Sequence, residues 1–378
     1  MYKAKSLVVI PSVRNPKVIS DYVKNARIYG FDTNSLFFLI LIENFSDKLS
    51  YVNELKVNDL EGVVLNQKDR DKFLADLKII KFNKVIPKRS HAETSFGLIY
   101  IALNKEFEYG FFIDDDTKPD NNYNFFEQHI NNLNFTGKIT EVSSNFKWVN
   151  VLYQNFSRTK LYPRGYPYSK MGEDIKLKPV KLNKKSIWVS QGLWTNIPDL
   201  DAIRILMDGD LNGQAKTILN RNDFKENFTV AKENFLTVCS MNLAFRRSVV
   251  PFFYQLPMDD NPYKIGRFDD IWSGLIAKKV LDSLDKRIIT GFPLCQHNKA
   301  PRSTFKDINS EAPGYESNEY ISRDLSKLNL NQDSSTSIVD KTIKIAINLR
   351  DKGSTDFIRY CGDKLLEWAN LINKIYEE

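Results

Sequence analysis

Three consecutive aspartates, Asp114, Asp115 and Asp116, follow the apolar run 111–113. This order predicts a buried strand that surfaces at its carboxyl end and presents carboxylates there. Because alternate side chains of an extended backbone point the same way, we expect Asp114 and Asp116 on one side and Asp115 on the other. A divalent cation would relieve the repulsion between the carboxylates, and hard oxygen ligands suit magnesium or manganese. The triplet taken alone is equally compatible with a solvated acidic turn.

A second group of residues suited to chemistry lies in an aromatic and basic segment, 153–185, which contains Arg158, Arg164 and Tyr166. Pro and Gly on either side of Arg164 predict a rigid loop rather than a regular helix or strand. Guanidinium groups pair with phosphate and aromatic rings stack on sugars or bases, so this loop suits an anionic ligand. The alternative is a surface loop held together by packing of arginine on aromatic rings.

Two further acids and a histidine lie later in the chain. Asp269 and Asp270 open a predicted helix, where acidic residues also serve to compensate the helix dipole. His297 follows a predicted strand, and a neutral imidazole would suit a metal site completed by the aspartates. His129 lies on the apolar face of another predicted helix and is expected to be a structural or surface residue rather than a ligand.

The composition is that of a globular protein with a mild preference for anionic ligands. The 378 residues are 42% hydrophobic and 27% charged, with a net charge of +7. Lys and Arg are spread along the chain, so a nucleic-acid partner is not expected. The three cysteines form no CxxC pair, which argues against a disulfide framework or a thiolate zinc site. The N-terminal apolar run is too short for a signal peptide and no run approaches a membrane span, so we expect a cytoplasmic protein.

Strands and helices are predicted to alternate in the first third of the chain. Predicted strands cover 7–10, 37–42, 63–65 and 111–113, and predicted helices cover 16–29, 68–78 and 93–104. This alternation predicts an α/β fold with a central, mostly parallel sheet flanked by helices. Ligands of such sheets bind at the carboxyl ends of the strands, where Pro11, Ser12, Glu43 and Asn44 lie together with the aspartates. Neither GxGxxG nor a P-loop motif occurs, which argues against a dinucleotide fold or a Walker ATPase.

The remainder of the chain is less regular. Further strands are predicted at 187–190, 238–245 and 288–291 and further helices at 121–135 and 271–284, whereas 201–235 gives no clear pattern. Residues 301–335 are polar and are expected to form a covering loop or linker. Amphipathic helices are predicted at 336–350 and 355–376. We expect them to pack on the same chain, with a homo-oligomer interface as the alternative.

Short motifs occur in a fixed order along the chain: VIPSVRN at 9–15, IDDD at 113–116, RGYP at 164–167, GLWTNIPD at 192–199, MNLAF at 241–245 and IGRFDDIW at 265–272. Taken together, they resemble the reversibly glycosylated polypeptide family, which includes the plant UDP-arabinopyranose mutases. The resemblance covers about residues 7–305. It implies a GT-A-like (Rossmann-like) catalytic domain that binds a nucleotide sugar over 1–305, followed by a C-terminal linker and helical extension over 306–378.

The resemblance also implies a UDP-sugar substrate and a site that depends on Mn²⁺ or Mg²⁺. The family's reactions are the interconversion of UDP-arabinopyranose and UDP-arabinofuranose, and reversible self-glycosylation on an arginine. One alternative is a metal-dependent retaining glycosyltransferase that acts on a separate acceptor or on itself. Another is a non-catalytic scaffold that binds a UDP-sugar.

Roles for individual residues follow from the matching positions. The metal is assigned to Asp114, Asp116 and His297, and catalysis is assigned to Arg158, Arg164, Asp269 and Asp270. Arg158 lies six residues before Arg164, whereas the glycosylated arginine of the family lies seven before, in a Tyr-Arg-Asp/Glu-Gly context that is missing here. Phe268 also replaces a tyrosine of the family. The family's Gln-Asp-Gly-Asp-like stretch is replaced by Glu43-Asn44-Phe45-Ser46.

The predicted substrate-binding residues are Pro11, Ser12, Arg14, Glu43, Asn44, Asp114, Asp115, Tyr166, Trp194, Asn242 and Trp272. The two arginines are expected near the diphosphate, and the Asp269-Asp270 pair near an oxocarbenium-like sugar. A mutase must retain the sugar while its ring opens and recloses, which demands a closed, dry pocket. Tyr166, Trp194 and Trp272 are expected to line it.

Overall fold

An 11-stranded sheet forms the centre of the computed structural model, which describes residues 5–14, 16–79, 84–88, 90–154, 161–172, 174–330 and 337–377. Its strands are β1 (Lys5–Ser12), β2 (Leu36–Ile42), β3 (Glu61–Leu65), β4 (Phe107–Ile113), β5 (Thr117–Pro119), β6 (Gly137–Ser144), β8 (Ile175–Leu182), β9 (Ile187–Asn196), β10 (Phe228–Val230), β12 (Asn242–Arg246) and β13 (Arg287–His297). The order is β3-β2-β1-β4-β12-β9-β13-β10-β6-β8, and β5 pairs with β13. A separate pair joins β7 (Trp148–Val149) to β11 (Phe235–Leu236).

Most strands of the sheet run in one direction. Strands β3, β2, β1 and β4 pair in parallel, and β9 and β13 pair in parallel farther along. Between them, β12 is antiparallel to both β4 and β9, so the strands on its two sides share a direction. The carboxyl ends of β1, β4 and β13 therefore lie at the same edge. The prediction of an α/β fold with a mostly parallel central sheet is confirmed.

The helices are α1 (Lys17–Ile28), α2 (Lys48–Val57), α3 (Gln67–Asp76), α4 (Ser95–Leu103), α5 (Phe125–Leu133), α6 (Ala202–Asp208), α7 (Asp269–Ser283), α8 (Thr304–Ser326), α9 (Ile338–Lys352) and α10 (Asp356–Glu377). Residues of β1 show why both sheet faces are covered, because Val8 and Ile10 join one apolar core whereas Leu7 and Val9 join another. Helices α1, α2 and α5 contribute to the first core, and α4, α7, α9 and α10 contribute to the second.

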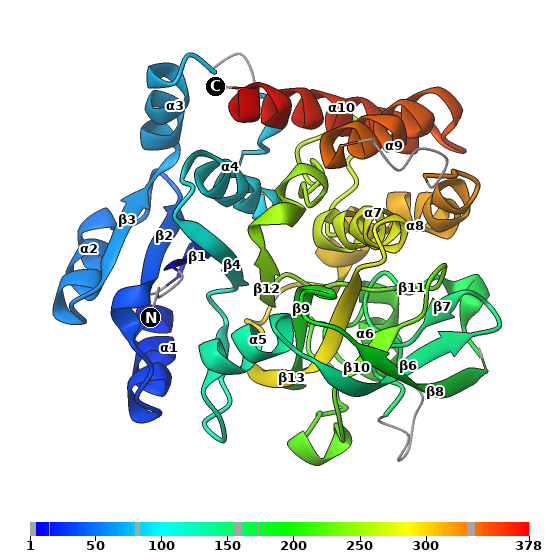
Figure 1. Cartoon of the computed structure of the whole chain (residues 1–378), viewed down its shortest axis with the longest axis horizontal. Coiled ribbons are helices and arrows are strands. Elements are labelled where there is room, and N and C mark those ends of the chain that lie inside the picture. The colour runs from blue at the N-terminus through cyan, green and yellow to red at the C-terminus, as the bar shows by residue number, and fades with distance from the viewer. Residues whose placement is uncertain are drawn as a thin grey trace.

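The two C-terminal helices pack on the rest of the chain. In Figure 1 α9 and α10 cross the top of the molecule above α4 and α7. Helix α10 contacts α4, and α9 contacts α7. The indole of Trp368 stacks on Tyr254 with a centroid separation of 5.0 Å and donates to the Pro251 carbonyl at 3.1 Å. No helix in the described part of the chain is both long enough and apolar enough to cross a membrane.

The expectation of a loop or linker over 301–335 is wrong for much of that segment, because Thr304–Ser326 forms the helix α8. Its polar composition suggested a loop, yet several of its polar side chains are buried with partners. Asn318, for example, accepts a hydrogen bond from the Trp272 indole and donates one to the Gly165 carbonyl. The segment 201–235, which gave no pattern, contains α6 and β10, and β8 lies within the aromatic and basic segment.

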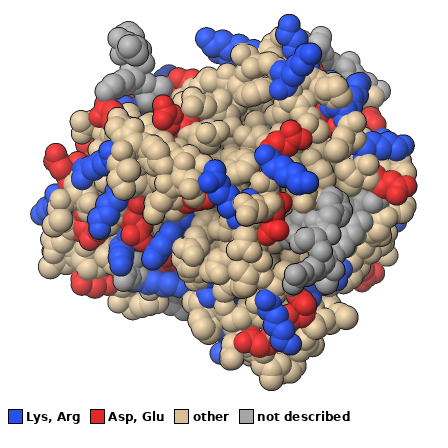
Figure 2. Space-filling model, turned by 90° about the horizontal axis from the view of Figure 1, so that it is seen from below, with Lys and Arg blue, Asp and Glu red and all other residues tan. Residues whose placement is uncertain are grey.

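Charged side chains are mixed on the surface. Figure 2 shows Lys and Arg interspersed with Asp and Glu on the face seen from below, without a continuous basic area. This pattern agrees with the spread of charge along the sequence. Because this face carries no basic patch, we expect a site for a charged ligand in the cavities of the molecule.

Candidate active site

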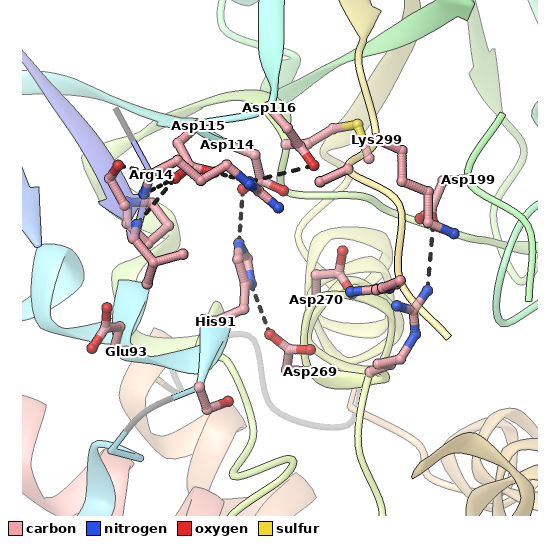
Figure 3. A pocket seen from close by; sticks show the side chains of 18 of the residues that line it. Arg14, His91, Glu93, Asp114, Asp115, Asp116, Asp199, Asp269, Asp270 and Lys299 are labelled. Atoms are coloured by element: carbon pink, nitrogen blue, oxygen red, sulfur yellow. Dashed lines mark hydrogen bonds and ion pairs between the residues drawn. The ribbon is translucent and has the colours of Figure 1, made fainter. Parts of the chain in front are cut away.

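A cavity of about 360 Å³ opens at the carboxyl edge of the sheet. It is lined by Pro11, Ser12, Val13, Arg14, Glu43, Ser90, His91, Glu93, Asp114, Asp115, Asp116, Arg164, Asp199, Met241, Asp259, Arg267, Asp269, Asp270, His297, Lys299, Ala300 and Arg302. The lining is strongly charged, with acids and cations from distant parts of the chain facing one another (Figure 3). This edge is where the sequence placed the candidate residues.

The aspartate triplet forms one wall. Asp115 accepts hydrogen bonds from the Ser12 hydroxyl at 2.9 Å and from the backbone N–H groups of Val13 and Arg14 at 3.0 and 3.1 Å. The Arg14 guanidinium also pairs with Asp115, and it lies 3.6 Å from Asp116. All three carboxylates line the same cavity, so the expectation that Asp115 faces away is wrong. The strict alternation fails because β4 ends at Ile113 and the triplet lies in a turn.

His91 bridges two walls of the cavity. Its Nε2 lies 2.9 Å from Asp114 Oδ1, and its Nδ1 lies 2.8 Å from Asp269 Oδ2 (Figure 3). The residue begins a short 3-10 turn, His91–Thr94, directly before α4, whereas Asp269 begins α7. A single imidazole therefore links the triplet to the Asp269-Asp270 pair.

The carboxylates set the charge of this imidazole. Burial opposes protonation of His91, but the charge of Asp114 and hydrogen bonds to Asp114 and Asp269 raise its pKa well above the ordinary value. Burial likewise opposes ionisation of Asp269, yet the hydrogen bond and charge of His91 lower its pKa. Asp269 is therefore held as a carboxylate in spite of its burial.

Arg164 holds the opposite wall. Its Nε donates to Asp199 Oδ2 at 2.9 Å, and its two terminal nitrogens donate to the two oxygens of Asp270 at 3.2 and 3.1 Å. A further N–H donates to the Arg267 carbonyl, so all but one of its donors are engaged within the protein. Burial disfavours the charge of Arg164, but Asp199 and Asp270 raise its pKa well above the ordinary value. In return, Arg164 and Arg267 overcome burial and lower the pKa of Asp199 to about 2.

The backbone beside Arg164 requires a glycine. Gly165 has a φ of +79°, and a Cβ there would lie 2.5 Å from Ile271 of α7. This close approach brings the loop against the first turn of α7, where Asp270 lies. Asn318 of α8 then fixes the Gly165 carbonyl at 2.9 Å. The RGYP motif is thus a packing motif as well as a carrier of the arginine.

Asp116 and His297 supply the groups best suited to a metal ion. His297 Nδ1 lies 2.7 Å from the Ile197 carbonyl, so Nδ1–H donates there and Nε2 faces Asp116 Oδ2 at 3.8 Å. A hydrogen bond from the other ring nitrogen to a carbonyl is typical of metal-binding imidazoles. Burial opposes protonation of His297, but the neighbouring Asp116 carboxylate raises its pKa, and a metal ion would compete with that proton. Within the described ranges, no group of three or more His, Cys, Asp or Glu side chains converges as a metal site.

The structure brings most of the predicted residues to the cavity. Those that line it are Pro11, Ser12, Arg14, Glu43, Asp114, Asp115, Asp116, Arg164, Asp269, Asp270 and His297. Arg158 lies outside the described residues. Asn44 is exposed beyond the lining, where its side chain accepts from the Lys68 N–H at 3.4 Å.

Four predicted substrate-binding residues belong to the interior instead. Tyr166, Trp194 and Trp272 are at most 1% exposed and lie outside the cavity lining, so the expectation of an aromatic lining is corrected. Tyr166 packs on Trp148, and Trp272 donates its indole N–H to Asn318. Asn242 is fully buried too.

The amide of Asn242 joins a structural network. It donates to the Leu193 and Pro293 carbonyls at 2.9 and 3.0 Å, and its Oδ1 lies 2.9 Å from His129 Nε2. Burial lowers the pKa of His129 to about 3, so this imidazole is neutral. The structural role expected for His129 is confirmed.

The sequence analysis missed several residues of the lining, namely His91, Glu93, Asp199, Asp259, Arg267, Lys299 and Arg302. Asp199 and Arg267 stood inside quoted motifs, GLWTNIPD and IGRFDDIW, and Lys299 stood two residues after His297. Their places in or beside these motifs could have identified them as candidate site residues. His91 had none, since no motif surrounds it and its partners lie 23 and 178 residues away.

Comparison with known proteins decides the family. The family model described as reversibly glycosylated polypeptide matches residues 32–376. The chain belongs to the reversibly glycosylated polypeptide family. The resemblance inferred from the ordered motifs is thereby confirmed.

Relatives in this family are named as UDP-arabinopyranose mutases. The chain is 30% identical over 287 residues to probable UDP-arabinopyranose mutase 1 of Pisum sativum, covering 73% of this chain and 70% of that protein. It is 27% identical over 371 residues to probable UDP-arabinopyranose mutase 2 of Solanum tuberosum, covering 96% of this chain and 88% of that protein. These names agree with the prediction that the chain is an enzyme.

Solved structures are more distant. Glucosyl-3-phosphoglycerate synthase of Mycobacterium tuberculosis, crystallised with Mn²⁺, UDP-glucose and phosphoglyceric acid, matches at 10% identity with a TM-score of 0.42. The match covers 88% of this chain and 81% of that one. A likeness of this degree carries no argument about chemistry.

Proposed function

We propose that this reversibly glycosylated polypeptide is a nucleotide-sugar mutase that interconverts the pyranose and furanose forms of a UDP-sugar of the UDP-arabinopyranose type. Its family and the names of its relatives support this proposal. The single structural observation that carries it is the His91 bridge. One cavity brings together an acidic turn suited to a metal–diphosphate and, through the imidazole, a buried carboxylate pair suited to a cationic sugar.

The sugar side of the cavity belongs to Asp269 and Asp270. When the bond between the anomeric carbon and the diphosphate oxygen breaks, positive charge develops on the sugar ring. Asp269 is held ionised by His91 and would stabilise that charge. Arg164 fixes both oxygens of Asp270, which keeps that carboxylate oriented. The sugar's O4 then bonds to the anomeric carbon and gives up its proton, while the bond from that carbon to the original ring oxygen breaks and that oxygen takes up a proton. The released diphosphate finally reattaches to the anomeric carbon, so the isomerisation consumes no co-reactant.

A divalent cation would be held by Asp116 and His297 together with Asp114. When bound, Mn²⁺ or Mg²⁺ would neutralise negative charge on the diphosphate leaving group. The donor types suit such an ion, because Asp114 and Asp116 supply hard carboxylate oxygens and His297 supplies an imidazole whose Nδ1–H is fixed to a carbonyl, although the three side chains do not converge as a ligand set in the described structure. On the opposite side, Arg14 and the backbone of the loop after β1 hold Asp115 and keep the triplet in place.

The decisive experiment needs no acceptor. The purified chain is incubated with UDP-arabinopyranose and MnCl₂, and the nucleotide sugars are separated by chromatography. We expect a new UDP-linked peak with the mass of the substrate. Asp116→Asn should lose the metal-dependent turnover, whereas Asp260→Asn, at an exposed position outside the cavity lining, should keep it.

Other products would reject the mutase. Free UDP together with a glycosylated acceptor or glycosylated protein would establish a transferase instead. An unchanged substrate in the presence of metal would reject both activities for this sugar.

A further inference from the structure

Lys299 is a buried cation that faces the cavity and has no hydrogen-bond partner in the described part of the chain. The residue is 7% exposed and lines the cavity. Its Nζ has no hydrogen-bond partner among the residues that the structure describes. In Figure 3 its side chain lies on the Asp199 side of the cavity, across from Arg14 and Asp115. A buried ammonium group of this kind is costly unless a ligand completes its hydrogen bonds.

The backbone holds this lysine in place beside the aspartate triplet. The N–H of Asn298 donates to the Asp116 carbonyl at 2.8 Å, and the Asn196 side chain donates to the His297 carbonyl at 3.1 Å. Beyond the lysine, the N–H of Arg302 donates to a backbone carbonyl at 2.9 Å. The short segment between these anchors leaves Lys299 little freedom to turn away from the cavity.

The acids around Lys299 are already engaged by arginines. Asp199 pairs with Arg164 at 2.9 Å, Asp307 pairs with Arg302 at 2.8 Å, and Glu311 pairs with Arg267. These acids lower the cost of the buried ammonium without forming a hydrogen bond to it. The positive charge of Lys299 is thus available to an anion that enters the cavity.

A phosphate group is the anion that best fits the unpartnered ammonium of Lys299. A lysine ammonium is a compact charge with rotatable N–H donors, which suits non-bridging phosphate oxygens. Arg164, expected from the sequence to meet the diphosphate, has all but one of its donors occupied within the protein. Lys299 has its whole set of donors free of protein partners in the described structure.

We propose that Lys299 binds the diphosphate of the nucleotide sugar directly and is its main cationic contact on the wall opposite Arg14. This assignment rests on the proposed function for the identity of the ligand. The ammonium group would contact the diphosphate in the bound substrate and in the UDP released during the reaction. Its loss should therefore weaken the binding of every ligand that carries the diphosphate.

The test compares Lys299→Met with wild type by isothermal titration calorimetry. The probes are UDP, inorganic pyrophosphate and uridine, each titrated in the presence of MnCl₂. Lys306→Met, at an exposed position of α8, is the matched control. We expect Lys299→Met to bind UDP and pyrophosphate at least about tenfold more weakly, as loss of a charge-assisted hydrogen bond implies. Binding of uridine and all binding by Lys306→Met should stay within about twofold.

The outcomes separate this assignment from the proposed function. If wild type and Lys299→Met bind UDP equally, the lysine assignment is overturned while a UDP-sugar enzyme remains. If wild type binds pyrophosphate but not UDP, and the variant loses pyrophosphate, the lysine assignment stands and the UDP-sugar proposal fails. If the variant loses uridine as much as UDP, Lys299 does not act on the diphosphate.

Thermal stability gives a second readout, because Lys299→Met should weaken ligand binding without lowering the stability of the ligand-free protein. Removing an unpaired buried charge should leave the ligand-free Lys299→Met protein at least as stable as wild type in thermal unfolding. A structural lysine would instead lower the midpoint when replaced. A lower midpoint combined with equal weakening of all three probes would therefore overturn the assignment.

Discussion

His91 connects residues that the chain keeps far apart. Its two ring nitrogens meet Asp114 and Asp269, so replacing it should affect both carboxylates at once. We expect His91→Ala to lower turnover of UDP-arabinopyranose by about 100-fold, because small displacements of positioned groups have effects of this size. The measurement is the initial rate of isomerisation at saturating substrate.

A double-mutant cycle tests whether the loss of turnover in His91→Ala arises from its contact with Asp269. If His91 acts through Asp269, the effects of His91→Ala and Asp269→Asn on turnover should be far from additive in the double variant. Additive effects would show that the two side chains act independently. Phe305→Ala, at an exposed position of α8 outside the cavity lining, is a control that should leave the rate unchanged.

Glu93, in the cavity lining, should make the free energy of unfolding depend on pH. The carboxyl is 4% exposed, and burial raises its pKa from the ordinary 4.5 to about 7, although Arg70 at 2.8 Å opposes the shift. Because the folded state binds this proton more tightly, the free energy of unfolding should fall as pH rises from about 4.5 to about 7. The shift corresponds to about 3 kcal/mol.

Replacement of the acid removes this dependence. Glu93→Gln keeps an acceptor for Arg70 but cannot titrate. Urea unfolding of both proteins should be measured between pH 4.5 and 8. As pH rises, the unfolding free energy of wild type should fall by about 3 kcal/mol relative to that of Glu93→Gln, and this fall should level off above pH 7. Parallel profiles would contradict the assignment of this titration to Glu93. Glu316→Gln, at an exposed position of α8, is the control.

At the scale of elements, the loop that carries Arg164 depends on its contact with α7. Gly165 and Gly172 both have positive φ, +79° and +89°, but only Gly165 has a neighbour, Ile271, in the space of a Cβ. Gly172→Ala should therefore cost about 1 kcal/mol from backbone strain alone. Gly165→Ala should cost roughly 3 kcal/mol or more, since steric overlap adds to the same strain. Urea unfolding of both variants measures the difference, and equal losses would show that the contact with Ile271 is unimportant.

Elements with a strong apolar pattern were predictable. The runs at β1, β2 and β4 are buried on both faces, and their continuous apolar character marks them in the sequence. Helix α8 was not predictable in the same way. Its buried face is built from polar side chains such as Glu311 and Asn318, whose partners lie in distant segments. Periodicity of apolar residues does not report such a face.

The same limit applies to the site. Ordered motifs located Asp114, Arg164 and Asp269 correctly at one cavity, because strand ends and helix starts are visible in the sequence. Trp194 and Trp272 belong to those motifs as well, yet they pack in the core. A motif marks residues that the fold needs together, and burial alone decides whether they face a ligand or the interior.

At the scale of the molecule, the cavity joins segments that are spread from Pro11 to Arg302. Its walls come from β1, from the turn after β4, from α7 and from the segment that links β13 to α8. Helices α9 and α10 lie above α4 and α7 in Figure 1, where α10 contacts α4 and α9 contacts α7. A ligand in the cavity should therefore stabilise the folded chain as a whole rather than one lobe of it.

The last prediction concerns metal and nucleotide together. UDP at a free concentration 100 times its dissociation constant should raise the free energy of unfolding by about 2.7 kcal/mol. If Asp116 and His297 hold a cation that contacts the diphosphate, MnCl₂ should enlarge the shift that UDP produces in thermal unfolding, and EDTA should reverse the gain. Asp116→Asn should unfold near the wild-type midpoint without ligand, because among the described residues the basic groups nearest the Asp116 carboxylate are 3.6 and 3.8 Å away. The variant should lose the Mn²⁺-dependent part of the shift and keep the remainder. An equal UDP shift in wild type with MnCl₂ and with EDTA would contradict a metal-assisted diphosphate site.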